Sequence, residues 1–250
     1  MSTGPDCMRT QVRRRFVVVS LLAALVALTG CAADGPDAAE TASATGPVGS
    51  AVAEPAILVA SGVGVIASGC SLVASLGSGV VVERSGQVAT AAHTVRGASM
   101  LTVVDAEGQE HLASVTSFDK DSDLALLDVP TLTAPPLSLG TAQVGPATLI
   151  TWRRSDGVTQ QFVGVTRLLK INIEDIYADE VVQRTGLEVD GDVIVGQSGG
   201  PVVDASGEVI GIIYATSKDR DAVGFATDHA ELRELIDARS VRGVANGQCP

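Results

Sequence analysis

Lysine and aromatic residues are scarce in this chain of 250 residues, and acidic residues outnumber basic ones. It holds 17 Lys and Arg against 29 Asp and Glu, a net charge of −12, and its run of adjacent arginines lies at 13–15. Nucleic acids are bound through clusters of basic side chains that neutralise phosphates, so this composition excludes a nucleic-acid partner. Apolar residues make up 46% of the chain, which excludes disorder throughout. The length suffices for one large domain or two small ones with a buried core.

The apolar run at the N-terminus, Phe16 to Leu28, is too short to cross a membrane. As a helix it would span about 20 Å, against roughly 30 Å for the hydrocarbon core. Arginines precede it and small residues follow, which is the pattern of an export signal. The segment Leu28-Thr29-Gly30-Cys31 resembles the bacterial lipobox, so we expect residues 1–30 to be a lipoprotein signal peptide and Cys31 to be lipidated. An ordinary secretory signal is the alternative.

The segment that follows the signal is expected to be a spacer. Residues 31–57 are rich in Ala, Gly, Pro, Ser, Thr and acidic residues and show no helical or strand period, which predicts a flexible linker. Two acyl chains on Cys31 would hold the protein stably at a membrane. We therefore expect an exported protein that is lipid-anchored to the cell membrane, facing the periplasm or the extracellular side, with its folded domain at 58–250.

Cysteine is scarce as well, and a role can be assigned to each of the four cysteines. Cys7 would leave with the signal and Cys31 would carry lipid, so Cys70 and Cys249 remain. In an exported protein these two are expected to form a disulfide. It would close a loop of about 180 residues, for which the chain-entropy model gives roughly 5 kcal/mol. Two free buried thiols are the alternative.

Short runs rich in Val, Leu and Thr alternate with turns in the body of the chain. The run Gly79–Val82 is followed by a turn and the run Val88–Thr90, and the run Leu101–Val104 by a turn and the run His111–Val115. Strands at such regular spacing predict a β-sandwich or β-barrel and disfavour βαβ units.

Prolines and one helix signal complete the predicted architecture. Residues 129–136 hold three prolines, so this segment cannot be a central strand and is expected to cross between two halves. Asp228, with Glu231 three residues later, marks the start of a helix. The fold class predicted is all-β: two antiparallel β-barrels at about 58–135 and 136–226, then a C-terminal helix at about 228–239.

Three short segments carry groups suited to nucleophilic catalysis. His93 ends an apolar run, Asp123 precedes another, and Ser198 lies in the glycine-rich segment 196–201. In this order they supply a general base, the carboxylate that orients it and a nucleophile. Glycines at such a turn let the N–H groups of Gly196 and Ser198 point to one place, where they would form an oxyanion hole.

These segments resemble those of the trypsin-like serine proteases, and among them the HtrA-like bacterial group. The intervals of 30 residues from His93 to Asp123 and of 75 from there to Ser198 are similar to those of compact bacterial members. The resemblance covers about residues 60–250 and extends to the segment 175–177, which is similar to periplasmic proteases of mycobacteria. It implies a chymotrypsin-like fold and an endopeptidase that hydrolyses protein or peptide substrates through an acyl-enzyme. It also implies no metal and no organic cofactor.

The resemblance places a substrate pocket and shows one departure. Gln197 stands where Asp or Asn is usual; its side chain can hydrogen-bond but cannot form an ion pair with a new N-terminus, so activation by N-terminal insertion is not expected. Asp192 falls at the floor of the pocket for the residue before the cut, where a carboxylate would favour Lys or Arg. Asp190 is an alternative match, which would leave Asp192 in solvent. Tyr214 and Gly224 fall where pocket walls are expected.

An esterase is a rival reading, because residues 196–200 also fit the G-x-S-x-G pattern of α/β-hydrolases. That pattern needs a helix directly after the serine and a histidine further on, for which His229 is available. The run Pro201-Val202-Val203 instead predicts a strand. A proteolytically silent envelope binding protein on the same fold stays open, and so does the oligomeric state.

Other titratable residues are weaker candidates for catalysis. His111 is expected to be a solvated side chain at a strand edge and His229 a surface residue at the start of the terminal helix. Three further aspartates compete with Asp123 for the position beside the base, but Asp123 directly precedes the apolar run, as in the family motif. The competing residues are Asp119, Asp121 and Asp128.

Overall fold

A computed structural model of the chain describes residues 54–69, 71–238, 246–247 and 249. The predicted signal peptide, Cys31, Cys70 and the linker up to residue 53 lie outside the described residues. The linker prediction is wrong at its end, because helix α1 runs Pro55–Ser61. Proline suits the first position of a helix, where its N–H would have no partner, and this start signal lies in the sequence. Of the described helices, none is long and apolar enough to cross a membrane.

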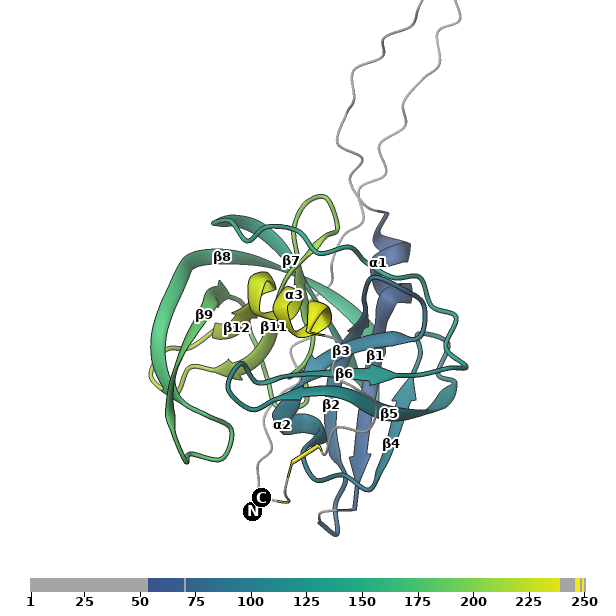
Figure 1. Cartoon of the computed structure of the whole chain (residues 1–250). Helices are drawn as coiled ribbons and strands as arrows, with labels where there is room; N and C mark the ends of the chain where they lie inside the picture. Colours follow the sequence, from purple (N-terminus) through teal and green to yellow (C-terminus); the bar gives the residue numbers. More distant parts are fainter. Residues whose placement is uncertain (1–53, 70, 239–245, 248, 250) are drawn as a thin grey trace, which may run out of the picture. The chain divides into compact units, whose positions relative to one another are not determined.

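The first half of the domain is a closed six-stranded antiparallel barrel (Figure 1). Its neighbouring strands follow the order β1-β2-β3-β6-β5-β4. Valine, leucine and alanine side chains of these strands fill the interior, as expected for β-branched and aliphatic residues on a pleated surface. The short helix α2, Ala92–Val95, directly follows β3. The strands are β1 Gly62–Ser68, β2 Ser75–Val81, β3 Gln87–Ala91, β4 Met100–Val104, β5 Glu110–Asp119 and β6 Leu124–Asp128.

The second half is another closed barrel, with neighbours in the order β10-β11-β12-β9-β8-β7. Its longest ladder joins β8 to β9 and carries one register shift, between Val165 and Arg167. The two barrels confirm the predicted fold class. The strands are β7 Gly145–Arg153, β8 Gly157–Glu174, β9 Val181–Asp190, β10 Pro201–Val203, β11 Val209–Thr216 and β12 Val223–Asp228.

Helix α3, His229–Asp237, ends the described fold and packs on both barrels (Figure 1). The Asp228 carboxylate accepts the N–H of Ala230 at 2.9 Å, so the predicted N-cap is confirmed. Glu231 does not complete a capping box: its carboxylate accepts instead the N–H of Thr185 in β9, at 2.8 Å. The buried side chains of the helix, Leu232 and Leu235, join a cluster that contains residues of both barrels.

Two further features hold the barrels together. The segment between β6 and β7 forms a bridge to each barrel, Val82 with Leu137 and Leu139 with Val209, which confirms the predicted crossing. Trp152 of β7 is buried, and its indole lies directly on Gly64 of β1, where a Cβ would stand 2.2 Å from the ring.

Candidate active site

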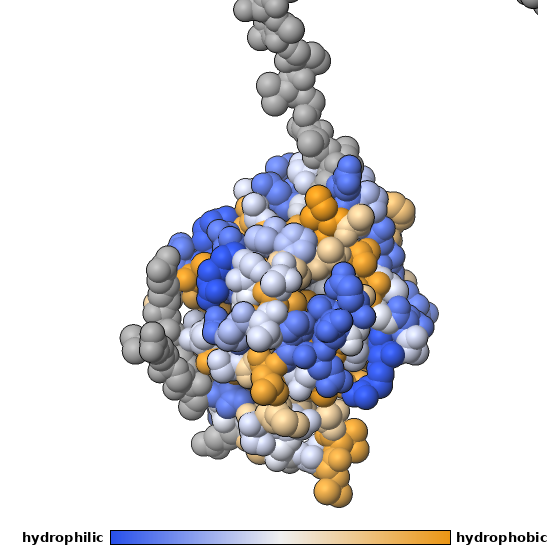
Figure 2. All heavy atoms as spheres, turned by 90° about the vertical axis from the view of Figure 1, so that its right-hand side faces the viewer, coloured by the Kyte–Doolittle hydropathy of each residue, from blue (hydrophilic) through white to orange (hydrophobic). Residues whose placement is uncertain are grey.

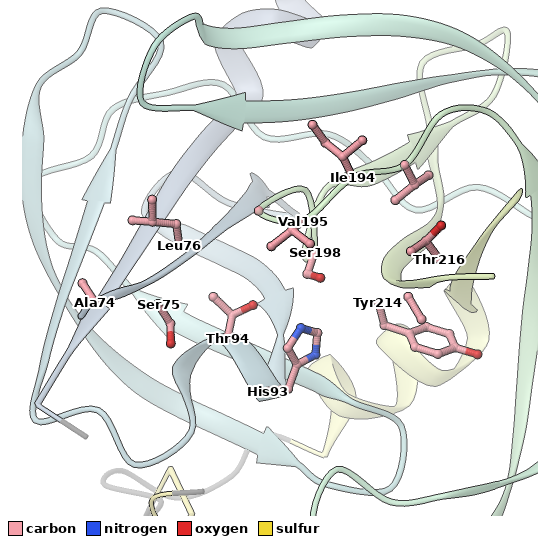
Figure 3. Close-up of a pocket in the computed structure, with 13 residues that line it drawn as sticks. Ala74, Ser75, Leu76, His93, Thr94, Ile194, Val195, Ser198, Tyr214 and Thr216 are labelled. Carbon is pink, nitrogen blue, oxygen red and sulfur yellow. The ribbon is translucent and has the colours of Figure 1, made fainter. Parts of the chain in front are cut away.

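A pocket of about 590 Å³ holds two of the predicted catalytic side chains, His93 and Ser198 (Figure 3). Figure 3 shows that Ala74, Ser75 and Leu76 lie on one side of it, and Tyr214 and Thr216 on the other. The walls therefore come from the start of β2 and the residue before it in the first barrel, and from β11 of the second. The remaining lining residues are Thr94, Val193, Ile194, Val195, Gly196 and Ala215.

The His93 ring is fixed by Asp123. Helix α2 presents His93 as its second residue, and Nδ1 lies 2.8 Å from Oδ2 of Asp123. The other carboxylate oxygen accepts the backbone N–H of His93 at 2.9 Å, and the carbonyl of Asp123 accepts the N–H of Ala92 at 3.0 Å. Asp123 itself has a φ of 58°, a left-handed conformation that aspartate tolerates better than most residues. With Nδ1 occupied, Nε2 is the ring nitrogen left to exchange a proton in the pocket.

The Ser198 loop joins β9 to β10 and is shaped by two glycines in the left-handed region, Gly196 (φ 94°) and Gly199 (φ 89°). A side chain at Gly199 would stand 2.1 Å from the Ser78 carbonyl oxygen, so the loop is pressed against β2. Within the described chain, the N–H groups of Gly196 and Ser198 donate no hydrogen bond, whereas the N–H of Gly199 binds the Ile213 carbonyl at 2.7 Å. These two amides, on either side of Gln197, are thus without a hydrogen-bond partner among the described residues.

Ser198, the predicted nucleophile, and His93, the predicted base, are not directly bonded to each other in this structure. No hydrogen bond links His93 to Ser198 among the residues that the structure describes, although both line the same pocket. Catalytic hydrogen bonds are often long before substrate binds and shorten in the complex. The arrangement therefore presents a serine, an oriented imidazole and two free amides around one cavity.

Gln197 binds the Ser198 loop to the second barrel. Its side chain is buried; Oε1 accepts the N–H of Ile194 at 2.9 Å, and Nε2 donates to Oγ1 of Thr151 at 3.2 Å. The Gln197 side chain thus forms hydrogen bonds, as expected from the sequence, and its bond to Ile194 closes the turn from residue 194 to residue 197. The loop is held by neutral groups.

The predicted pocket residues are only partly in place. Tyr214 lines the cavity as expected, but Asp192 is exposed and is not among its lining residues. Asp192 thus lies outside the described pocket, as in the alternative that left it in solvent, and Val193, the next residue, is buried and lines the pocket. Gly224 lies behind this wall: a Cβ there would stand 2.5 Å from Val193. The apolar wall residue, Val193, was missed, although it lies in the apolar run just before Gly196.

The competing aspartates and histidines lie elsewhere. Of the four aspartates considered, Asp123 is the one whose carboxylate contacts His93. His111 is not solvated as predicted, because its ring binds Thr131 at 2.8 Å and Asp105 at 3.1 Å and is mostly buried. The prediction that His229 is a surface residue is also wrong, since its side chain is 18% exposed and lies beside Ala142.

One group of carboxylates in the described chain is close enough to share a metal ion, namely Asp121, Asp175 and Glu180. The Lys120 ammonium donates to all three, at 2.7, 2.7 and 3.3 Å. The positive charge among these three carboxylates is therefore that of the Lys120 side chain. Separately, Cys249 is disulfide-bonded, and its expected partner Cys70 lies outside the described residues.

A buried carboxylate gives the second barrel a defined response to acid. Glu188 of β9 accepts hydrogen bonds from Arg220 and Arg167, which hold its pKa at about 2 instead of 4.5. A lowered pKa stabilises the fold above pH 4.5, and this stabilisation is lost as the pH falls through 2. Because both arginines are partly exposed, we expect Glu188→Gln to lower the free energy of unfolding at pH 7 by about 1–2 kcal/mol.

Urea unfolding of this variant from pH 7 to pH 2 checks the prediction. The variant should lose less stability than the parent between pH 4.5 and pH 2, since the titrating group is gone. The exposed Glu110→Gln is the matched control and should follow the parent at every pH. Identical pH curves for Glu188→Gln and the parent would contradict the role given to these ion pairs.

Two closed barrels with a histidine–carboxylate pair and a serine in a pocket between them define the chymotrypsin-like class of folds. The sequence matches the trypsin-like peptidase domain over residues 77–212, and the chain belongs to this family. It is 31% identical over 178 residues to the serine protease Rv3671c of Mycobacterium tuberculosis, covering 69% of this chain and 44% of that protein. It is 32% identical over 173 residues to the chloroplastic Protease Do-like 1 of Arabidopsis thaliana, covering 64% and 38%.

A solved structure supports the same assignment. The crystal structure of Rv3671c protease from M. tuberculosis in its active form superposes with a TM-score of 0.72 at 28% identity, covering 78% of this chain and 87% of that one. The predicted resemblance to trypsin-like and HtrA-like proteases is therefore confirmed. The chain spans less than half the length of the curated relatives described above.

Proposed function

We propose that this protein is a serine endopeptidase of the cell envelope that cuts peptide bonds through an acyl-enzyme. The proposal rests chiefly on the pairing of buried Asp123 with His93, which lines the same pocket as Ser198 and Gly196, whose amides have no partner among the described residues. A fixed base, a nucleophile and preorganised donors are what acyl transfer requires. The loop glycines keep those donors near the reacting carbonyl.

In the first half of the reaction, Nε2 of His93 takes the proton of Ser198 as Oγ attacks the substrate carbonyl carbon. Asp123 holds the Nδ1 proton and stabilises the imidazolium that forms. The N–H groups of Gly196 and Ser198 receive the oxyanion. When the C–N bond breaks, His93 returns the proton to the leaving amine, and the acyl group stays on Ser198 as an ester.

In the second half, water replaces the amine. His93 takes a proton from the water, whose oxygen attacks the ester carbon, and the same two amides stabilise the second oxyanion. Collapse breaks the bond to Oγ, the proton returns to Ser198, and the new carboxylic acid leaves. Turnover of casein by the purified full-length protein, with new peptide N-termini found by mass spectrometry, tests the proposal; intact casein after prolonged incubation would contradict it.

The pocket walls favour an apolar residue before the cut. Val193, Ile194 and Ala215 line the cavity, while Asp192 is exposed outside it. We expect peptides with Val or Leu at that position to be cut at least about ten times faster than peptides with Lys or Arg, because a charge there would lose water without a partner. A chromogenic peptide series that differs at this one position measures the ratio.

The variant Asp192→Asn is the matched test of the pocket assignment. If Asp192 lies outside the pocket, the variant should keep the parent's ranking of the series and change each kcat/KM by less than about twofold. A fall confined to Lys and Arg peptides would contradict the apolar pocket and restore the carboxylate floor.

We also propose that lipid on Cys31 holds the protein at the membrane, and that a disulfide joins Cys70 to Cys249. The lipobox-like segment supports the first, and the disulfide-bonded state of Cys249 supports the second. Metabolic labelling with a palmitate analogue should mark the parent and spare Cys31→Ala; equal labelling would contradict the anchor.

The rival functions have less support. An α/β-hydrolase elbow needs a helix after the serine, but β10 follows and runs Pro201–Val203. A silent binding protein would not require His93 to be oriented by a buried carboxylate or two amides to be left free beside the serine. We therefore retain the endopeptidase as the proposed function.

A further inference from the structure

The turn between β8 and β9 reaches from the second barrel to the first. We call residues 175–180 the hairpin tip; it follows the last pair of the ladder, Glu174 with Val181. Oδ1 of Asp175 folds the tip by accepting the N–H groups of Tyr177 at 2.9 Å and Asp179 at 3.1 Å. The second oxygen of this carboxylate is left to bind a group outside the tip.

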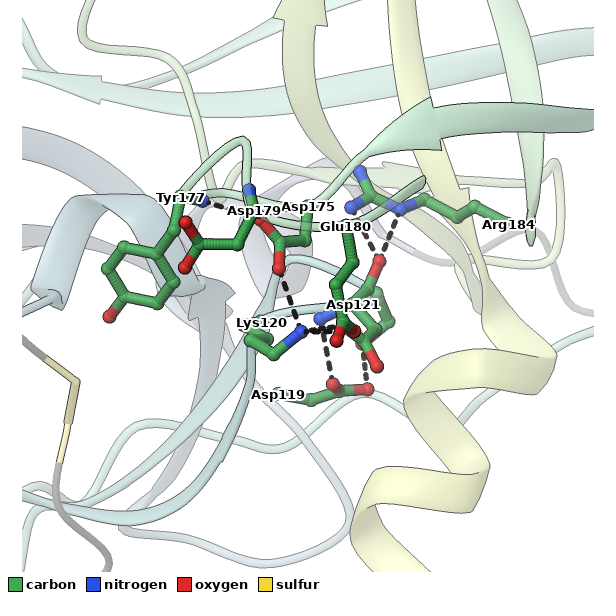
Figure 4. Close-up of polar contacts among 9 residues, drawn as sticks. Asp119, Lys120, Asp121, Asp175, Tyr177, Asp179, Glu180 and Arg184 are labelled. Carbon is green, nitrogen blue, oxygen red and sulfur yellow. Dashed lines mark hydrogen bonds and ion pairs between the residues drawn. The ribbon is translucent and has the colours of Figure 1, made fainter. Parts of the chain in front are cut away.

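That group is Lys120, which belongs to the loop that carries Asp123 (Figure 4). Its Nζ donates to Oδ2 of Asp175 at 2.7 Å, and its carbonyl accepts the N–H of Ile176 at 3.3 Å. The Asp175 side chain is fully buried, and the bond from Lys120 holds its pKa below the ordinary value. A buried carboxylate bound to an ammonium fixes the loop against the tip more firmly than an exposed ion pair would.

The same loop, residues 120–123, is bound to the second barrel at the two residues that directly precede Asp123. Arg184 of β9 donates from Nε and Nη2 to the Asp121 carbonyl at 2.9 and 2.6 Å. Oγ1 of Thr227 donates to the Ser122 carbonyl at 2.8 Å. The left-handed backbone of Asp123 thus follows three consecutive residues that are each held by the other barrel.

The hairpin tip also contacts the segment that carries His93. Arg96, at the end of helix α2, donates from Nη1 to the Ile176 carbonyl at 2.6 Å, and its guanidinium lies 5.9 Å from the centre of the Tyr177 ring. One tip therefore binds both segments whose side chains must meet. On the pocket side, the guanidinium of Arg184 lies 4.9 Å from the ring of Tyr214.

We propose that Lys120 and Asp175 are positioning residues, which act through the hairpin tip to hold the side chains of Asp123 and His93 in position relative to each other. The proposal rests on the proposed function, because it concerns the same catalytic pair. A triad carboxylate on a loop gains precision when neighbouring structure locks the loop, and a shift of about 1 Å can cost 10²-fold in rate. Neither residue lines the substrate pocket, so substrate binding should not depend on them.

The test compares Lys120→Met with Lys170→Met, an exposed lysine on β8 of the same hairpin. With a chromogenic peptide, Lys120→Met should lower kcat by roughly 10- to 100-fold and leave KM within about twofold, while Lys170→Met matches the parent. Lys120→Arg, which can still donate to Asp175, should recover most of kcat. Thermal unfolding must show that each variant is folded at the assay temperature.

Asp175→Asn provides a second route if Lys120→Met does not fold. It keeps one oxygen for the two N–H groups of the tip and removes the charge that Lys120 meets, so the same fall in kcat is expected. Folded variants with kcat within twofold of the parent, or with losses confined to KM, would overturn the proposal. Ser198→Ala is assayed beside them: if it is as active as the parent the proposed function itself fails, and otherwise the outcome concerns the hairpin tip alone.

Discussion

Replacing Ser198 with alanine is expected to lower kcat for peptide hydrolysis by on the order of 10⁵- to 10⁶-fold. The change removes the oxygen that is proposed to bond to the substrate carbonyl carbon. What remains is the contribution of the two free amides and of substrate binding, so the residual rate should still exceed that of water by about 10³-fold. KM should change little, because the cavity walls are intact. Active-site-directed inhibitors should lose their target.

The exposed Ser206→Ala is the matched control. Ser206 lies in the turn after β10, and its replacement also removes a single hydroxyl. This variant should keep the parent's kcat within about twofold. A Ser198→Ala protein that is free of parent enzyme and still cleaves peptide at a tenth of the parent rate would show that the nucleophile lies elsewhere.

Replacing Asp123 with asparagine is expected to lower kcat by on the order of 10⁴-fold. The carboxylate accepts from Nδ1 of His93 at 2.8 Å and from the backbone N–H at 2.9 Å. An amide can satisfy one of these donors, but its NH₂ group then faces the other. An NH₂ group facing Nδ1 of His93 would favour the imidazole tautomer that carries its proton on Nε2. In that tautomer Nε2 cannot accept the proton of Ser198. The loss should therefore appear in kcat and spare KM.

Asp128→Asn provides the control for this variant, because Asp128 pairs with Arg84 at 3.2 Å in a solvent-exposed position. Such pairs contribute little, so activity should stay within twofold of the parent. Steady-state kinetics of the two variants on one peptide makes the comparison. An Asp123→Asn enzyme that retains a tenth or more of kcat would contradict the orienting role of this carboxylate.

The residues of the proposed triad could be selected from the sequence because each lies in a short local pattern. His93 follows a predicted strand and Asp123 precedes another. The glycines around Ser198 predict a turn whose amides can be free. The barrels followed from strand spacing, and the crossing segment from its prolines. These signals depend on neighbouring residues, which the sequence displays directly.

What the sequence did not disclose depends on contacts between distant segments. Lys120 and Asp175 meet across two barrels, and nothing beside either residue indicates its partner. The pocket lining depends on such contacts too: Asp192 and Val193 are adjacent in the sequence, and Val193 packs against Gly224 of β12. Glu231 of helix α3 likewise accepts a hydrogen bond from Thr185 of strand β9 and does not complete the expected capping box.

Covalent labelling with a fluorophosphonate, read by intact-protein mass spectrometry, tests the central claim most directly. The reagent reacts with a serine whose proton is taken by an oriented base, and it requires no knowledge of the natural substrate. The parent should gain the mass of one adduct, with the modified residue mapped to Ser198, and Ser198→Ala should gain none. Equal labelling of both proteins, or labelling of neither, would contradict the assignment of His93, Asp123 and Ser198 as a catalytic triad.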